Sequence, residues 1–334
     1  MTRTTRSLAL VLAVALLATL GLTGCIKSGA STTTSDQPHQ GTAEPIAIKI
    51  GTLPTEDSLP LWVAQDRGYF AVEGVPKVDI IEFQSAQERD AAFASGAIDA
   101  YMGDIIAAAD QQAAGKGNKI ATIMLGADQS QGRFGIAVPP KSKVTTASEL
   151  ANVPVGTSSA TIQEYVLDGL MSEAGVPTSS VKVEEVKKVP VRFQLLMSDK
   201  LKAAALPEPF LSLAEQGGAK IVADDTKAQA NLSQTVLVFS DSFLAKKGGT
   251  ATRDAILNAW DVAANDINKD PNAYRATLVQ KAKLPKSLES TYKVNTYPMH
   301  VLPSKDDVDA VLAWMKDKGY LKTDVTYEQL TAAQ

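Results

Sequence analysis

Residues that can bind a small molecule occur where short apolar stretches of the chain end. Thr55-Glu56-Asp57-Ser58 follows the stretch 46–50, in which isoleucine alternates with other residues. Thr157-Ser158-Ser159-Ala160-Thr161 follows a second apolar stretch at 153–156. Hydroxyl and carboxylate side chains at such places can hydrogen-bond a ligand, and free amides at a helix start can hold an anion or a carbonyl group. The residue types therefore indicate binding chemistry at two loops.

Loops that join the carboxyl end of a strand to the amino end of a helix are where open α/β sheets hold their ligands. Two such loops in one chain predict two lobes that face one cleft. The candidate ligand-binding residues are Thr55, Glu56, Asp57, Ser58, Gln84, Ser85, Gly103, Asp104, Phe134, Thr157, Ser158, Ser159, Thr161, Glu208 and Phe210. Asp57, Ser58 and 157–159 would serve equally well as helix caps, and Phe134 and Phe210 as core residues.

The charges of these candidates bear on the solute. Desolvated like charges are costly, so several carboxylates in one cleft disfavour a strongly anionic solute such as a sulfonate. They favour a neutral, amine-bearing or heteroaromatic solute, a description that aminopyrimidines fit. Arg89, Arg133 or Arg192 would reverse this inference if one of them reached the cleft. The loops in question carry no lysine or arginine, and their four carboxylates are those of Glu56, Asp57, Asp104 and Glu208.

Catalytic residues are harder to find in this chain. It has two histidines, His39 and His300, and one cysteine, Cys25, so neither a serine–histidine–aspartate set nor a cluster of histidine and cysteine metal ligands can be assembled. We therefore expect no catalytic residue, no metal and no cofactor. A pair of carboxylates such as Asp57 and Asp104 could still perform acid–base chemistry, which keeps an enzyme open as the alternative.

Secondary-structure patterns place the candidate loops in an α/β framework. After the first strand and the helix that Gly68 ends, apolar strands are expected at 78–83, 97–102 and 119–125. Helical stretches are expected between them, at 88–95 and 105–114. This alternation of strand, loop and helix is typical of a parallel α/β fold.

The second half of the chain repeats that order. Strands expected at 153–156, 181–186 and 201–206, with a helix at 190–197, match the first, second and third strands and the helix at 88–95. The apolar stretches 133–138 and 234–240 fit neither repeat and are natural crossover strands between the lobes. We therefore predict a discontinuous lobe I at 46–139 plus 237–334 and a lobe II at 140–236.

The amino terminus has the pattern of a targeting segment. Arg3 and Arg6 precede an apolar stretch at 8–20, which is shorter than the roughly 20 residues that a membrane-spanning helix needs. Leu22-Thr23-Gly24-Cys25 resembles the lipobox of bacterial lipoproteins. We predict a signal peptide at 1–24, lipidation of Cys25, and a flexible tether at 25–45 that is rich in serine, threonine, glycine and glutamine.

Length and charge narrow the class of protein. A chain of 334 residues is long enough for two domains that each have a sizeable core. The formal net charge of −4 argues against nucleic acid, which requires a basic face. Because Cys25 is the sole cysteine, a disulfide within the chain is impossible.

Three motifs resemble those of a known family. Trp62-Val63-Ala64-Gln65-Asp66-Arg67-Gly68-Tyr69-Phe70 resembles the A-x-x-x-G-x-F signature of the SsuA/THI5 (NMT1-like) group, and Ser95-Gly96-Ala97-Ile98-Asp99-Ala100 and Leu206-Pro207-Glu208-Pro209 resemble other motifs of the same group. The resemblance covers about residues 46–330. It implies the type II periplasmic-binding fold, in which two Rossmann-like lobes are joined by two crossover strands with the ligand cleft between them.

The resemblance also implies a function. Members of this group include solute-binding receptors of ABC importers, which close on a small solute and deliver it to a permease and its ATPase. We expect a monomeric receptor, anchored to the cell membrane through Cys25 and facing outside the cytoplasm, for a pyrimidine precursor of thiamine. Receptors for sulfonates, taurine or nitrate are alternatives. A pyrimidine synthase of the THI5 type is disfavoured, because that resemblance implies a cysteine-rich motif and an active-site histidine that this chain lacks.

Overall fold

The computed structural model describes residues 43–331. The predicted signal peptide 1–24, the predicted lipidation site Cys25 and most of the predicted tether 25–45 lie outside the described residues. None of the helices described is both long enough and apolar enough to cross a membrane.

The first of two five-stranded sheets, sheet A, has the strand order β2-β1-β3-β10-β4. β1 is parallel to β2 and β3, whereas β10 is antiparallel to β3 and β4. All residues of β3, and all residues of β1 except Lys49, are buried, as expected for strands that helices cover on both faces. The strands are β1 (Ile48–Thr52), β2 (Val78–Glu82), β3 (Ala100–Asp104), β4 (Asn118–Leu125) and β10 (Thr235–Ser240).

Sheet B has the order β7-β6-β8-β5-β9, which repeats that of sheet A strand for strand. β6 is parallel to β7 and β8, and β5 is the antiparallel strand, paired with β8 and β9. We use lobe I for sheet A with its helices and lobe II for sheet B with its helices. The strands are β5 (Phe134–Val138), β6 (Pro154–Thr157), β7 (Lys182–Glu185), β8 (Ala204–Pro207) and β9 (Lys220–Asp224).

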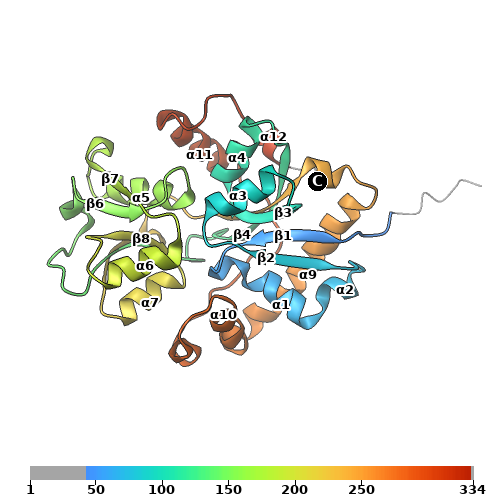
Figure 1. Ribbon diagram of the computed structural model, residues 1–334, viewed down its shortest axis with the longest axis horizontal. Coiled ribbons are helices and arrows are strands. Elements are labelled where there is room, and N and C mark those ends of the chain that lie inside the picture. Colours follow the sequence, from blue (N-terminus) through green and yellow to red (C-terminus); the bar gives the residue numbers. More distant parts are fainter. Residues whose placement is uncertain (1–42, 332–334) are drawn as a thin grey trace, which may run out of the picture. The chain divides into compact units, whose positions relative to one another are not determined.

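Helices cover both faces of each sheet (Figure 1). One face of sheet A carries α3, α4, α11 and α12, and the other carries α1, α2, α9 and α10; lobe II has α5 on one face and α6 and α7 on the other. The α-helices are α1 (Leu59–Arg67), α2 (Tyr69–Val72), α3 (Ala86–Ala94), α4 (Ile105–Ala113), α5 (Ile162–Glu173), α6 (Val189–Met197), α7 (Phe210–Gln216), α8 (Asp241–Leu244), α9 (Gly249–Lys269), α10 (Arg275–Lys281), α11 (Lys305–Asp317) and α12 (Tyr327–Leu330).

The predicted α/β class with two Rossmann-like lobes is confirmed, and two details differ from the sequence prediction. Both sheets are mixed rather than wholly parallel, because the strand that follows each crossing between lobes enters its sheet antiparallel. The predicted boundary between lobe I and lobe II at 139/140 is also different. It assigns β5 to lobe I, whereas β5 pairs with β8 and β9 in sheet B. The chain therefore changes lobe at 126–133, and it returns at 225–234, ahead of β10.

Local sequence signals set where the loops turn into helices. Ser85, Asp104 and Thr161 each accept a backbone N–H bond with their own side chain at the start of α3, α4 and α5. Gly68 ends α1 in the left-handed conformation, with φ of 75°, where a residue with Cβ would be strained. These caps hold the strand-exit loops of both lobes in defined places above the buried cores.

Candidate functional site

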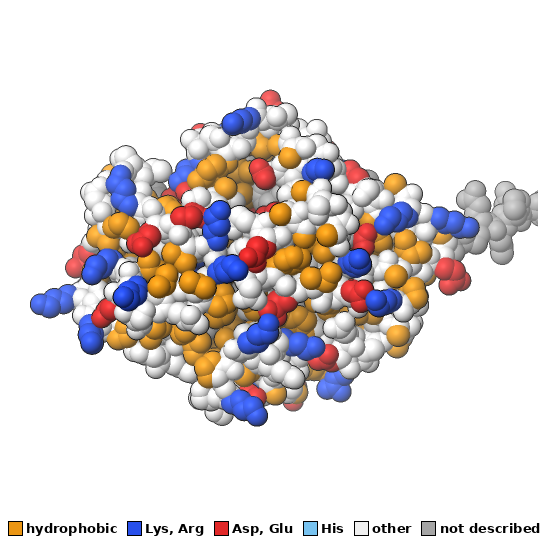
Figure 2. Space-filling model, viewed as in Figure 1, with side chains coloured by type: hydrophobic (Ala, Val, Ile, Leu, Met, Phe, Trp, Pro, Cys, Tyr) orange, Lys and Arg blue, Asp and Glu red, His pale blue; other side chains and the backbone are white. Residues whose placement is uncertain are grey.

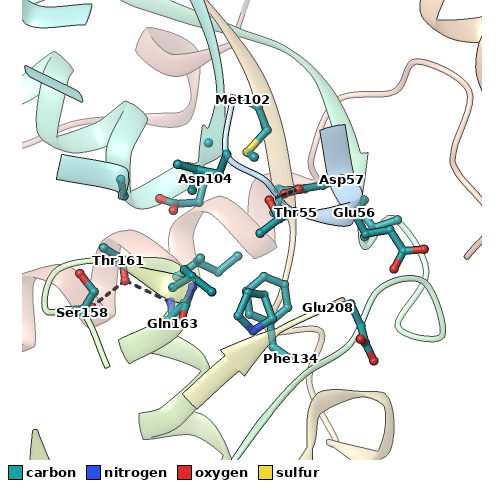
Figure 3. Close-up of a pocket in the computed structure, with 18 of the residues that line it drawn as sticks. Thr55, Glu56, Asp57, Met102, Asp104, Phe134, Ser158, Thr161, Gln163 and Glu208 are labelled. Carbon is teal, nitrogen blue, oxygen red and sulfur yellow. Dashed lines mark hydrogen bonds between the residues drawn. The ribbon is translucent and has the colours of Figure 1, made fainter. Parts of the chain in front are cut away.

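The carboxyl ends of four parallel strands bring the candidate loops together. β1 and β3 in lobe I lead into the loop 53–58 and into Asp104, and β6 and β8 in lobe II lead into Ser158 and Glu208. Between these loops lies a cavity whose empty space, including its open mouth, is about 610 Å³. Figure 3 shows the cavity with residues of both lobes around it.

Nine of the fifteen predicted binding residues line this cavity. In Figure 3 the ring of Phe134 points into the space between Asp104 and Thr55. Gly103 leaves room for the ring of Tyr101, because a Cβ atom at this position would lie 2.6 Å from that ring. The nine are Thr55, Glu56, Asp57, Gly103, Asp104, Phe134, Ser158, Thr161 and Glu208.

The other six predicted residues lie outside the lining. The hydroxyl of Ser58 donates to the carbonyl of Leu53, and Ser85 caps α3. Gln84 bonds Glu82 at 2.7 Å. These three side chains form hydrogen bonds within their own loops. Helix capping and local hydrogen bonding are therefore the roles that the structure describes for them.

The remaining three belong to lobe II. Thr157 is fully buried within β6. Both the backbone and the hydroxyl of Ser159 donate to the carboxylate of Glu185, at 3.0 and 2.8 Å. Phe210 packs against Phe193 with ring centroids 5.9 Å apart, as a core aromatic would. Strand-exit position alone could not separate these side chains from those that face the cavity.

Asp57 and Asp104 present buried carboxylates to the cavity from neighbouring strands of sheet A. The hydroxyl of Thr55 donates to Asp57 at 2.6 Å, and the N–H of Ala107 donates to Asp104 at 2.8 Å. Burial raises the pKa of both carboxyl groups, against the lowering effect of these hydrogen bonds and of the nearby Arg89. The backbone of Ile162 also acts to lower the pKa of Asp104. Asp104 and Ile162 line the same cavity, so this lobe I carboxylate lies near the first turn of α5 in lobe II.

The carboxylates of Glu56 and Glu208 point away from the centre of the cavity (Figure 3). Glu56 accepts from the hydroxyl of Tyr292 at 2.5 Å and from the backbone of Asn295 at 2.7 Å. Glu208 accepts from both the backbone and the hydroxyl of Ser212, at 3.1 and 2.8 Å. Burial raises the pKa of Glu56 to about 8. Two of the four predicted carboxylates therefore accept hydrogen bonds from residues of the surrounding protein instead of pointing into the cavity.

Cations also reach the cavity, which corrects the picture of a purely acidic cleft. Arg89, Arg133, Lys187 and Arg192 line it together with the carboxylates. The three arginines are the side chains that were expected to change the charge inference if they reached the cleft, and all three line it. Lys187, which the sequence prediction did not include, lies in the loop between β7 and α6. The charge of the solute can therefore not be read from the loop carboxylates alone.

Arg89 and Arg192 are nevertheless largely committed to the protein. Arg89 donates to Asp90 at 2.7 and 2.9 Å and to the carbonyl of Met102 at 2.9 Å. Arg192 donates to the carbonyl of Val186 at 2.7 and 3.0 Å, to the carbonyl of Ala205 at 2.9 Å and to the side chain of Gln163. Burial lowers the pKa of Arg192 to about 9. Few of their N–H groups are left for a ligand.

Much of the remaining lining is apolar, and it surrounds the polar groups on several sides. Such surfaces can bury the flat or aliphatic body of a ligand, and a ring can stack against Phe134. The apolar lining residues are Leu53, Ala86, Met102, Leu125, Phe134, Ile162, Val189 and Pro207.

The two lobes touch around the cavity. At its rim, Lys188 pairs with Glu88 at 2.9 Å, and the side chain of Gln87 donates to Ser158 at 2.8 Å. The backbone N–H of Glu56 lies 3.5 Å from the carbonyl of Glu208. The lobes are thus drawn together over the cavity in this structure.

A second set of contacts joins α5 of lobe II to the end of α11 in lobe I. Lys318 pairs with Glu164 at 2.7 Å and with Asp168 at 2.9 Å. Trp314 donates to Asp168 at 2.9 Å, and the hydroxyl of Tyr320 donates to Glu164 at 2.8 Å. We call these five residues the α5–α11 cluster.

Charged groups of both signs are interspersed over the face shown in Figure 2, with apolar side chains between them. Among residues 43–331 there is no group of three or more histidine, cysteine, aspartate or glutamate side chains placed to hold a metal ion. The chemistry that the described cavity offers is hydrogen bonding and apolar contact.

Comparisons with known proteins agree with this architecture. The model of the NMT1-like family matches residues 41–280. No curated protein sequence matches the chain. The alkanesulfonate-binding protein SsuA from Xanthomonas axonopodis pv. citri, solved bound to MOPS, has a TM-score of 0.71 at 18% identity, with 84% of this chain and 96% of that chain covered.

Two further solved structures share the fold. The periplasmic aliphatic sulphonate binding protein SsuA from Escherichia coli has a TM-score of 0.69 at 18% identity, covering 86% of this chain and 92% of that chain. The periplasmic nitrate-binding protein NrtA from Synechocystis PCC 6803 has a TM-score of 0.66 at 13% identity, covering 85% and 84%. At these identities the likeness shows a periplasmic binding protein fold.

Proposed function

The chain belongs to the NMT1-like family, and on that premise we propose that it is the solute-binding receptor of an ABC importer. The observation that carries this proposal is the cavity between the lobes, which strand-exit loops of both sheets line. A site shared by two lobes allows a solute to hold them together, so that binding selects the closed state. The rim contacts Glu88–Lys188 and Gln87–Ser158 would form as the lobes close.

The solute that fits this cavity best is a small heteroaromatic molecule with amino or ring N–H groups. Asp57 and Asp104 would accept its donors, and Phe134 would stack on its ring. Thr55, Ser158 and Thr161 add hydroxyl groups that can donate or accept. A pyrimidine precursor of thiamine meets this description. We propose that seven of the nine predicted residues that line the cavity touch the solute, while Glu56 and Glu208 hold its wall. The seven are Thr55, Asp57, Gly103, Asp104, Phe134, Ser158 and Thr161.

Two features of the cavity disfavour a strongly anionic solute. The first turn of α5, which could hold an anion, already faces the carboxylate of Asp104. The guanidinium groups of Arg89 and Arg192 already donate to Asp90 and to backbone carbonyls. A sulfonate would add negative charge beside Asp57 and Asp104 without many free donors to meet it.

An oxyanion such as a sulfonate, taurine or nitrate is the second candidate. Three arginines at the cavity favour it, and two of the fold relatives are an alkanesulfonate-binding protein and a nitrate-binding protein. Such an anion would pair with Arg133 or Lys187, or it would require Arg89 or Arg192 to exchange a backbone carbonyl for the ligand. A pyrimidine synthase remains the alternative from another class; we propose binding without catalysis.

In this proposal the receptor works outside the cytoplasm, with a permease and its ATPase as partners. Lipid on Cys25 and the tether 25–45 would keep it at the membrane and raise its effective concentration near the permease. The receptor would act as a monomer.

Thermal unfolding of the protein beginning after Cys25, stripped of co-purified ligand, tests the proposal. The solutes are aminopyrimidines, thiamine, taurine, alkanesulfonates, nitrate and amino acids. A true ligand at about 100 times its dissociation constant adds roughly 2.7 kcal/mol, which shifts the midpoint by several degrees. A shift with aminopyrimidines alone supports the first candidate, and a shift with taurine, sulfonates or nitrate replaces it with the second. Chemical conversion of any of these solutes by the protein would contradict the proposal that it is a receptor without catalytic activity.

A further inference from the structure

A second hollow adjoins the main cavity between α5 of lobe II and α4 and α11 of lobe I. It encloses about 280 Å³, again including its mouth. Asp104 and Ile162 border both spaces, so the two lie against one another. We call this hollow the side recess; its lining is Asp104, Ile105, Ile106, Ile162, Tyr165, Asn231, Leu232, Gln234, Asp307 and Val311.

Gln234 carries an acceptor in this lining that no described residue satisfies. Its side-chain N–H group donates to Asp307 at 3.0 Å, which fixes the orientation of the amide. Its Oε1 atom is buried and has no hydrogen-bond partner among the described residues, and the residue as a whole is 7% exposed. A buried carbonyl oxygen without a donor is unfavourable, because it has lost its bonds to water, and an occupant that donates a hydrogen bond would relieve this cost.

Asn231 repeats the arrangement three positions earlier. Its side-chain N–H group donates to the carbonyl of Gly126 at 2.6 Å, and its Oδ1 atom is likewise buried without a described partner. Both amides therefore have their donors engaged and their acceptors left over. Since Asn231 and Gln234 lie on the segment that returns to lobe I, the free oxygens come from the connection between the lobes.

The rest of the polar lining adds mainly acceptors. Asp104 and Asp307 contribute carboxylates, and the hydroxyl of Tyr165 is the one side-chain donor besides the amides among the described lining residues. Ile105, Ile106, Ile162, Leu232 and Val311 supply apolar walls. An occupant that fits must donate hydrogen bonds and have a small apolar stem, which is the chemistry of a primary amine.

We propose that the side recess is a subsite of the main cavity that receives an amino or ammonium arm of the solute, with Gln234 and Asn231 as its acceptors. This assignment rests on the receptor function proposed above and deepens it. The ring of the solute lies against Phe134, and the arm passes Asp104 into the recess. Gln234 then determines specificity, because it distinguishes solutes that carry the arm from those that lack it.

The occupant is tested directly, without knowledge of the solute, by soaking crystals of the protein in methylammonium chloride. The expected result is a methylammonium nitrogen within hydrogen-bond distance of Oε1 of Gln234 and Oδ1 of Asn231, and its loss in Gln234→Leu. A recess that holds only ordered water in the wild-type protein, which the same oxygens could bind, overturns the proposal.

Calorimetry then compares 4-(aminomethyl)pyrimidine with pyrimidine. The wild-type protein should bind the aminomethyl compound, which is an ammonium ion at neutral pH, at least about tenfold more tightly, the lower end of what is expected for a hydrogen bond that involves a charged group. Gln234→Leu should remove this preference, and Gln129→Leu should keep it, because Gln129 bonds Ala228 and Asp225 on the same connecting segment outside the recess.

The outcomes separate the two proposals. If Gln234→Leu still prefers the aminomethyl compound, the proposed subsite is overturned and the proposed receptor function is unaffected. If methylammonium binds in the recess but the protein binds neither pyrimidine compound, the amine subsite is supported and the proposal of a heteroaromatic solute is overturned.

Discussion

Arg89 and Arg192 occupy equivalent places in the two lobes. Arg89, on α3, donates to the carbonyl of Met102 in β3, and Arg192, on α6, donates to the carbonyl of Ala205 in β8, each at 2.9 Å and each thirteen positions along the chain. Both side chains are fully buried. A repeated bond from helix to strand indicates that these arginines tie each helix to its sheet, and this is why cations beside the cavity do not by themselves define an anion site.

Replacing Arg192 should therefore act mainly on stability. Arg192→Met removes the arginine donors from the half-buried carbonyl of Val186 and from the buried carbonyl of Ala205. We expect the free energy of unfolding to fall by about 2–4 kcal/mol, measured by urea denaturation. Arg253→Met is the matched control, since Arg253 pairs with its neighbour Asp254 at the surface and should change stability by about 0.5 kcal/mol or less. Unchanged stability together with lost binding would instead assign Arg192 to the solute.

Replacing the cavity carboxylates should act mainly on binding. Asn can keep the cap of α4, so Asp104→Asn should leave stability nearly unchanged, and it removes the charge that a solute donor meets. Asp57→Asn removes the second negative charge in the cavity. Each should weaken binding of an amine-bearing solute by about 10- to 100-fold in calorimetry, the range for hydrogen bonds to a charged group.

The control for these two variants is Asp66→Asn, whose carboxylate pairs with Lys281 at 3.0 Å on the surface of lobe I. Its affinity should match that of the wild-type protein. Tighter binding of an anion by Asp57→Asn or Asp104→Asn would favour the oxyanion candidate.

The α5–α11 cluster should set how closely the lobes approach. Glu164 and Asp168 are 2% and 9% exposed and lose their cation in Lys318→Met. A buried carboxylate without a cation has lost its hydration and has no partner to compensate for that loss. We therefore expect α5 to move away from α11 so that water can reach these carboxylates, and the free energy of unfolding to fall by roughly 1–3 kcal/mol. Spin labels on the two lobes should report a longer or broader distance distribution in the absence of solute.

Lys316→Met provides the comparison for Lys318→Met. Lys316 lies on the same helix and pairs with the exposed Asp324 at 2.8 Å. Its removal should leave the distance between lobes unchanged. Identical distance distributions for the wild type and both variants would show that the cluster does not control closure.

Glu56 should make stability depend on pH. Its folded pKa of about 8 lies above the ordinary value of 4.5, so the folded protein holds this proton more tightly than the unfolded chain does. The stabilisation that the proton provides is complete below about pH 4.5, falls as pH rises, and is lost above about pH 8. The free energy of unfolding should therefore decrease across this interval.

The measurement for Glu56 is a series of urea unfolding curves from pH 4.5 to 8.5 for the wild type and Glu56→Gln. The wild type should lose on the order of 2–4 kcal/mol more than the variant over this range, because glutamine does not titrate. The same slope for both proteins would mean that Glu56 ionises at its ordinary pKa.

Much of the fold could be predicted from the sequence because it depends on local patterns. Apolar stretches of strand length, helix caps such as Ser85 and Thr161, and the return of the same element order in the second half all lie within short segments. The antiparallel entry of β5 and β10 could not be predicted, since an apolar strand does not encode which neighbour it pairs with or in which direction.

The candidate site divides in a similar way. The sequence by itself determined the α/β class, the family, and the loops at which a ligand could sit, because strand-exit position and residue type are properties of the chain. Only the tertiary structure decided which side chains of those loops face inward. It turned Glu56 toward Tyr292, Phe210 toward Phe193 and Ser159 toward Glu185. It also brought Arg89 and Arg192 to the cavity wall and left Oε1 of Gln234 without a partner beside it. The physical reason is that the direction of a side chain and the cost of burying its charge depend on neighbours far away in sequence, which meet it only when the lobes pack.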